Sequence, residues 1–148
     1  MNIRRFLPCS IVKAAVLAGL VATVPAVSMA GVGLISPTDL YGNWVATLQG
    51  FTGCGHTAMH VVMKLGPAAT GTGTLTMHGQ CGDSVLTDQT FRVLTLDGSG
   101  AGTANLSCGP GCGWNLRIQV SPDRQIMNLV DVDPVNPGNY IAGVAVHY

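Results

Sequence analysis

The stretch CGHTAMHVVMK, residues 54–64, decides between two kinds of fold. On an α-helix, His56, Met59, His60 and Met63 would share one face, and imidazole with thioether is a ligand set that suits copper. On a β-strand the histidines and the methionines separate to opposite faces. The β-branched residues of the stretch, the glycines around it and the lack of an N-cap signature favour a strand. We therefore predict that no copper site forms, that the methionines fill the core and that the histidines face outward.

The rest of the chain continues this pattern, because apolar and β-branched stretches recur between turn signals, as in all-β proteins. We predict eight strands, at residues 40–49, 56–65, 72–78, 90–96, 101–107, 113–120, 125–132 and 139–147. Three connections, GPAATG, DGSG and SPDR, are short and rich in turn residues. The other four, which include GQCGDSVLTDQ, would lie together at the opposite end of an up-and-down meander. The expected fold is an eight-stranded antiparallel barrel, with a two-sheet β-sandwich as the alternative.

Four cysteines follow residue 30, namely Cys54, Cys81, Cys108 and Cys112. An even number of cysteines in an exported chain predicts two disulfides. A zinc site built from these thiolates and nearby imidazoles is the alternative, but the two-residue spacing of common zinc knuckles is absent. Of the three possible pairings we predict Cys54–Cys81, which would join adjacent loops at one end, and Cys108–Cys112, which flank a tight Gly-Pro-Gly turn.

The first 30 residues are typical of a secretory signal peptide, with a basic start, the apolar run AAVLAGLVATVPAV and small residues up to Ala30. Cleavage before Gly31 would leave one domain, residues 31–148, with four basic side chains, seven aspartates and a formal charge of −3. No basic patch favours nucleic acid, and no later apolar run is long enough to cross a bilayer. We expect a secreted or periplasmic protein that makes no membrane contact after cleavage.

The sequence DLYGNW, residues 39–44, opens the first predicted strand with the motif Gly42-Asn43-Trp44. This motif resembles the first-strand signature of the calycin superfamily, which includes lipocalins, avidins and a family of small bacterial metalloprotease inhibitors. The resemblance covers this strand and the strand count, and it implies a barrel in which Trp44 closes one end of the interior. Lipocalins usually place an Arg or Lys of the final strand over this Trp, whereas the last strand here, NYIAGVAVHY, has neither.

Signals for catalysis and for bound metals are weak. The chain contains no glutamate, no Gly-x-Ser-x-Gly elbow and no His-Glu-x-x-His helix. The loop DVDPVNPGN offers calcium the oxygens of Asp131, Asp133, Asn136 and Asn139, but it fits an EF-hand poorly and these residue types are also common in turns. We expect neither an enzyme nor a cofactor.

A non-catalytic binding protein is therefore the expected function, with a small apolar ligand inside the barrel or an extracytoplasmic protein as the partner. The alternative is a secreted protease inhibitor, or an adhesion or assembly protein, that acts through the disulfide-tied loops. The inhibitor resemblance adds GVGLISPTD, residues 31–39, as an inserting arm. The candidate binding residues are Trp44, Trp114 and Tyr140. Both tryptophans are expected to be buried, and a barrel plugged by them and by Leu116 would leave no room for a ligand.

The last two predicted strands carry apolar residues on both faces, in QIMNLVDV and NYIAGVAVHY. A barrel strand needs only one apolar face, and contiguous exposed apolar surface usually marks an interface. We expect a homo-oligomer that packs through these two strands. Lysine in place of Met127 and Ile141 is expected to shift such an assembly towards monomer.

Overall fold

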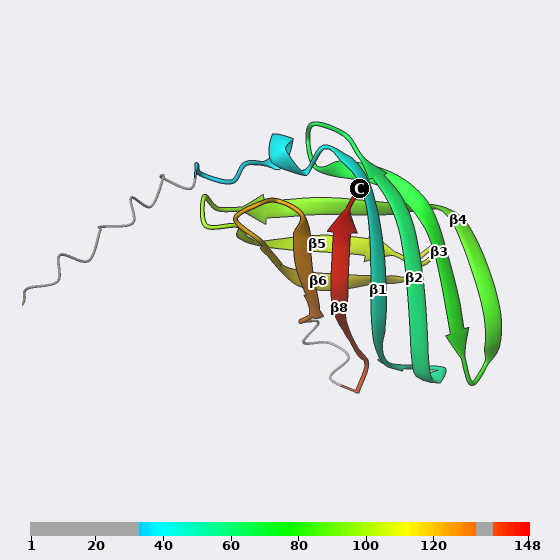
Figure 1. Cartoon of the computed structure of the whole chain (residues 1–148). Helices are drawn as coiled ribbons and strands as arrows, with labels where there is room; N and C mark the ends of the chain where they lie inside the picture. Colours follow the sequence, from blue (N-terminus) through cyan, green and yellow to red (C-terminus); the bar gives the residue numbers. More distant parts are fainter. Residues whose placement is uncertain (1–32, 133–137) are drawn as a thin grey trace, which may run out of the picture. The chain divides into compact units, whose positions relative to one another are not determined.

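The computed structural model describes residues 33–132 and 138–148, which form a closed antiparallel barrel of eight strands in up-and-down order (Figure 1). Each strand pairs with its neighbour in sequence, and the last pairs with the first. The strands are β1 (Gly42–Thr52), β2 (Gly55–Leu65), β3 (Thr70–Gly79), β4 (Gly82–Leu96), β5 (Ala101–Ser107), β6 (Gly113–Val120), β7 (Ile126–Asp131) and β8 (Tyr140–His147). The all-β class, the strand count and the barrel are confirmed over the sandwich. The signal peptide, residues 1–30, lies outside the described residues and stays a prediction.

Strand β2 has the alternation predicted from residues 54–64. Its inward side chains are buried and fill the core, and they include Met59 and Met63, whereas His56 and His60 are exposed on the outer face. The four side chains that a helix would have aligned therefore lie on opposite faces of one strand. The strand prediction is confirmed, and with it the separation of the methionines from the histidines.

Strand β4 begins at Gly82, whereas the sequence predicts it from residue 90. The expected long loop GQCGDSVLTDQ is a turn at Gln80 and Cys81, and its remainder pairs with β3. Two features hide this half of the strand: its side chains are mostly polar, and the register with β3 shifts near Asp88, whose φ is +57°. Pairing of β4 with β5 starts only at Phe91, so the first half of β4 pairs with β3 alone.

Trp44 closes one end of the barrel, which we call the closed end. Its side chain is fully buried, its Nε1–H donates to the carbonyl oxygen of Leu40 at 2.9 Å, and the His147 ring of β8 stacks on it with centroids 4.9 Å apart. Gly42 has a φ of +137°, and a Cβ atom there would collide with the His147 ring. The Gly-x-Trp motif thus leaves room for an imidazole to cover the indole, at the place where lipocalins usually have an Arg or Lys.

The segment before β1 also covers the closed end. A short 3-10 helix, η1 (Pro37–Leu40), precedes the strand, and Ile35 is buried with its N–H bonded to the carbonyl oxygen of Gly98 at 3.0 Å. Arg124 donates to the carbonyl oxygen of Gly33 at 3.0 Å. These two hydrogen bonds and the burial of Ile35 hold the described part of this segment against its own barrel, and the inserting arm stays a prediction.

Hydrogen bonds fix the start of η1. The backbone N–H of Ser36 donates to the Asp39 carboxylate at 2.8 Å and the Ser36 hydroxyl donates at 3.0 Å. These bonds, with the Arg124 guanidinium 3.5 Å away, lower the pKa of Asp39. The same carboxylate links η1 to Arg124 in the β6–β7 connection.

The outer face of β7 and β8 is apolar. Ile126, Val130, Val144 and Val146 are each more than 40% exposed, whereas Met127 and Ile141 are fully buried inside. The expected surplus of apolar surface is present, but the choice of Met127 and Ile141 as interface residues is wrong because both face the core. The apolar surface continues onto the neighbouring strands, since Val146 lies opposite the half-buried Val45 of β1 and Val45 lies opposite the exposed Val62 of β2.

Candidate functional site

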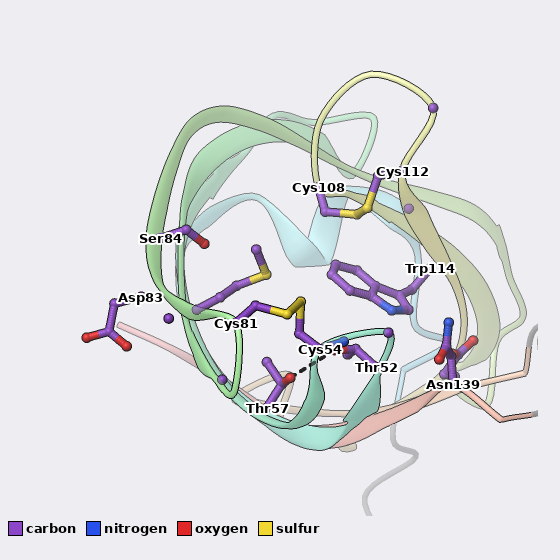
Figure 2. A pocket seen from close by; sticks show the side chains of 17 residues that line it. Thr52, Cys54, Thr57, Cys81, Asp83, Ser84, Cys108, Cys112, Trp114 and Asn139 are labelled. Carbon is purple, nitrogen blue, oxygen red and sulfur yellow. Dashed lines mark hydrogen bonds between the residues drawn. A yellow bond between two sulfur atoms is a disulfide. The ribbon is translucent and has the colours of Figure 1, made fainter.

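A cavity of about 470 Å³ lies at the end of the barrel that carries the disulfides, which we call the open end (Figure 2). Its wall comes from the β1–β2 turn, the start of β4, the β5–β6 connection and the residues that flank the stretch 133–137. Ligand pockets for small molecules typically measure about 300–1,000 Å³. The space is therefore large enough for one small molecule.

The cavity occupies only the open end, because side chains fill the barrel below it. The next inward-facing residues larger than glycine on β1, β2 and β6 are Leu48, Met59 and Leu116, and each is about 1% exposed. Trp44 and η1 seal the far end. A ligand in this barrel would therefore lie near the mouth, against the side chains of Trp114 and Met77.

Two disulfides frame the cavity, and their pairing is the one predicted from the sequence. Cys54 bonds to Cys81 and thereby joins the β1–β2 turn to the β3–β4 turn. Cys108 bonds to Cys112 within the β5–β6 connection. Because these cysteines bond to one another, they are not available as zinc ligands. Such bonds are typical of an oxidising, extracytoplasmic compartment.

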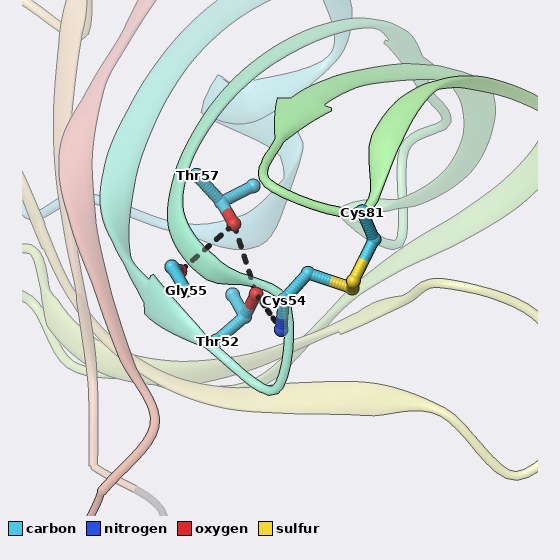
Figure 3. The surroundings of a disulfide bond; sticks show 5 residues. All are labelled: Thr52, Cys54, Gly55, Thr57 and Cys81. Carbon is cyan, nitrogen blue, oxygen red and sulfur yellow. Dashed lines mark hydrogen bonds between the residues drawn. A yellow bond between two sulfur atoms is a disulfide. The ribbon is translucent and has the colours of Figure 1, made fainter.

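A short chain of hydrogen bonds supports the β1–β2 turn beside the first disulfide (Figure 3). The Thr57 hydroxyl donates to the carbonyl oxygen of Gly55 at 3.2 Å and uses its only hydrogen there. The Thr52 hydroxyl, 2.9 Å away, must then be the donor to Thr57, and it accepts the N–H of Cys54 at 3.2 Å. Both threonines line the cavity, so its polar wall is held in a fixed orientation.

Trp114 forms much of the apolar wall. It is the first inward residue of β6, it lies opposite Leu106 of β5, and its side chain is 9% exposed. Figure 2 shows its ring among the side chains that line the cavity, with both disulfides around the same space. The CGPGC connection before it is closed by the Cys108–Cys112 bond and by an N–H···O bond from Cys108 to Cys112 at 3.1 Å.

We expect the two disulfides to contribute unequally to stability. Their cysteines are 27 and 4 residues apart in sequence. Loop-closure entropy assigns about 3.6 kcal/mol to the longer loop and about 2 kcal/mol to the shorter one. Urea unfolding should therefore show a larger loss of unfolding free energy for the double variant Cys54→Ser, Cys81→Ser than for the double variant Cys108→Ser, Cys112→Ser. An equal or reversed order would contradict the entropic account of these bonds.

The structure brings only one of the three candidate binding residues to the cavity. Trp114 lines it, Trp44 lies at the closed end, and Tyr140 is 55% exposed on the outer face of β8. Sequence reasoning missed Met77 and Ser84, which also line the cavity. Inward alternation along β3 and β4 could have found them, but β4 was expected to start after Ser84.

The other candidate ligand residues are distributed over different places. His78 and Asp83 form an exposed pair, with Nδ1 and Oδ1 2.9 Å apart, on the outside of β3 and β4. Asp131 and Asn139 line the cavity, while residues 133 and 136 of the expected calcium loop lie outside the described residues. Within residues 33–132 and 138–148, no group of three or more His, Cys, Asp or Glu side chains is arranged to hold a metal ion.

Comparison with known proteins assigns no family to this barrel. No protein-family model matches the chain, and no curated protein matches it in sequence. The closed eight-stranded architecture is consistent with a calycin-like barrel. In the described ranges, no helix has both the length and the apolar character needed to cross a membrane.

Proposed function

We propose that this protein is an exported, non-catalytic carrier of a small, largely apolar ligand that occupies the cavity at the open end. The observation that carries the proposal is the cavity itself, with Trp114, Met77 and two disulfides in its wall and a filled core beneath it. Apolar walls with a few fixed polar groups are typical of small-molecule sites. Here the fixed polar groups include the hydroxyls of Thr52 and Thr57.

The calycin resemblance supports the same proposal. The closed end has the Trp44 seal that the resemblance implies, although an imidazole covers the indole. The alternative, an inhibitor or adhesion protein that acts through the disulfide-tied loops, needs no cavity behind those loops. The open space behind them favours the carrier. We also propose that the carrier acts in the periplasm or outside the cell, since both disulfides need oxidising conditions.

Titration with N-phenyl-1-naphthylamine, a neutral apolar fluorophore, tests this proposal. We expect saturable binding with one site per chain and energy transfer from Trp114 in a Trp44→Phe variant, where Trp114 is the single tryptophan. Ser84→Phe fills the cavity from β4 and should weaken binding by at least about tenfold, equivalent to about 1.4 kcal/mol.

Val85→Phe is the matched control, because Val85 follows Ser84 on the same strand and is 63% exposed on the outer face. It should leave the affinity unchanged. No saturable binding by the wild-type protein, or equal affinities for the Ser84 and Val85 variants, would refute the carrier proposal.

We also propose that a second copy of the chain covers the apolar outer face defined by Ile126, Val130, Val144 and Val146. The outward residues of β7, β8 and β1 include no charged side chain along their described length. An uncharged apolar surface matches another copy of itself, and isologous dimers are the commonest closed assemblies. The cavity opens at the end of the barrel and not on this face, so a dimer of this kind would leave both cavities accessible.

A further inference from the structure

The wall of the cavity at the open end is rich in sulfur. Two disulfides and one thioether border the space, and they come from Cys54, Cys81, Cys108, Cys112 and Met77. The indole of Trp114 lies around the same space (Figure 2). Sulfur is more polarisable than carbon, and its contacts with aromatic rings are favourable. This wall therefore favours a ligand with an aromatic ring over a saturated ligand of the same size.

Trp114 strengthens the preference for an aromatic ring. It is the first inward residue of β6, and part of its side chain borders the open space. A ligand ring that stacks on the indole, or meets it edge to face, gains an interaction beyond the apolar area that it buries. A saturated ring of similar volume would bury a similar area and gain less. The two kinds of ring should therefore differ in affinity.

The N–H group of Trp114 is a hydrogen-bond donor without a partner in the described part of the chain. At the closed end, the Nε1–H of Trp44 donates to the carbonyl oxygen of Leu40 at 2.9 Å. Within residues 33–132 and 138–148, no group accepts the Nε1–H of Trp114, although this residue is only 9% exposed.

The position of Trp114 directs this donor to the cavity. Its Nε1 is not among the enclosed polar atoms of the described residues that lack a partner, so it borders open space. Because Trp114 is an inward residue that lines the cavity, that open space is the cavity. Buried indole N–H groups usually have a hydrogen-bond partner. An oxygen atom of a ligand would supply one here.

We propose that the ligand is an aromatic compound that carries a hydroxyl or carbonyl oxygen. Its ring packs against the sulfur atoms and the indole, and its oxygen accepts the N–H of Trp114. This inference rests on the proposed carrier function and names the class of ligand. Phenols and aryl ketones belong to this class, whereas saturated alcohols of the same size do not.

Two alcohols with the same bicyclic carbon skeleton test the preference for an aromatic ring: 2-naphthol and decahydro-2-naphthol, both uncharged at neutral pH. Isothermal titration calorimetry measures their affinities. We expect 2-naphthol to bind at least about fivefold more tightly. Met77→Leu replaces the thioether by a hydrocarbon of similar volume and should lower this ratio by about twofold. Met63→Leu is the matched control, because Met63 is buried in the core outside the cavity wall, and it should preserve the ratio.

A third probe, 2-methylnaphthalene, tests the hydrogen bond because it keeps both rings and lacks the oxygen. Trp114→Phe should weaken the binding of 2-naphthol at least about threefold more than that of 2-methylnaphthalene. Trp44→Phe removes the same N–H group from the closed end and should affect both probes equally. In the isotope-labelled wild-type protein, the NMR signal of the Trp114 indole N–H should move further with 2-naphthol than with 2-methylnaphthalene. This measurement decides the question even if Trp114→Phe does not fold.

Equal affinities of 2-naphthol and decahydro-2-naphthol for the wild-type protein would overturn this inference and leave the carrier proposal standing, because both alcohols would still bind. Equal effects of the two aromatic probes on the Trp114 signal would also overturn it, since the oxygen would then have no role. Failure of every probe to bind, N-phenyl-1-naphthylamine included, would overturn both proposals.

Discussion

Replacing Trp44 by alanine is expected to lower the free energy of unfolding by about 3–5 kcal/mol, the largest loss from any single side chain in the barrel. The indole is fully buried, donates a hydrogen bond to Leu40 and stacks on His147. Its removal would leave a cavity at the closed end, because β1, β8 and η1 cannot all move inward to fill it. Urea unfolding followed by circular dichroism measures the loss.

Trp114→Ala provides the comparison, because it is the same substitution at the other end of the barrel. One side of Trp114 already borders open space, so fewer packing contacts are lost and the destabilisation should be smaller. The loss of unfolding free energy from Trp44→Phe should be well below that from Trp44→Ala, since phenylalanine keeps an aromatic ring beside His147. Equal losses from the two alanine substitutions would contradict the view that Trp44 is a seal and Trp114 a cavity wall.

Lysine at Val130 and Val144 is expected to convert a self-associated protein to monomer. Both side chains are exposed on the apolar outer face, at 49% and 41%. A symmetric dimer contains each substituted position twice, once in each copy, so each substitution would bury two lysines. Burying an unpaired ammonium group costs several kcal/mol. A cost of about 3 kcal/mol raises the dissociation constant by about a hundredfold. Sedimentation velocity across a concentration series measures the change.

The control for this experiment is Leu94→Lys, on the outer face of β4, where the side chain is 52% exposed. It adds a similar charge to a similarly exposed apolar residue and should leave the assembly intact. Met127→Lys would unfold the protein instead of dissociating it, because Met127 lies in the core. A wild-type monomer at tens of micromolar would refute the proposed dimer.

Much of this fold could be predicted from local sequence patterns. In β2 one face carries Met59 and Met63 and the other carries His56 and His60, so alternation alone placed each side chain correctly. The meander placed all four cysteines at one end but did not select among their three possible pairings. Cys54–Cys81 was chosen because these residues lie in adjacent loops there, and Cys108–Cys112 because they flank a tight turn; the structure has this pairing.

The failures occurred where alternation is ambiguous or interrupted. In β7 both faces are apolar, so the pattern showed that Met127 and Ile126 lie on opposite faces but not which one is inside. In β4 the irregular register near Asp88 concealed a strand of 15 residues. The cavity could not be predicted either. Whether Trp114 plugs the barrel or walls a cavity depends on how the strands close around it, and sequence spacing does not encode that.

The stack of His147 on Trp44 has a consequence for how the chain folds. It joins the last strand to the first. A contact between residues so far apart in sequence costs a large loop-closure entropy, and such contacts slow two-state folding. As the chain emerges N-terminus first, β1 to β4 and the Cys54–Cys81 bond can form early, whereas β1 keeps an unpaired edge until β8 arrives. An unpaired strand edge is a template for aggregation. Synthesis of β8, the last eight residues of the barrel, therefore ends the period in which the chain is most prone to aggregate.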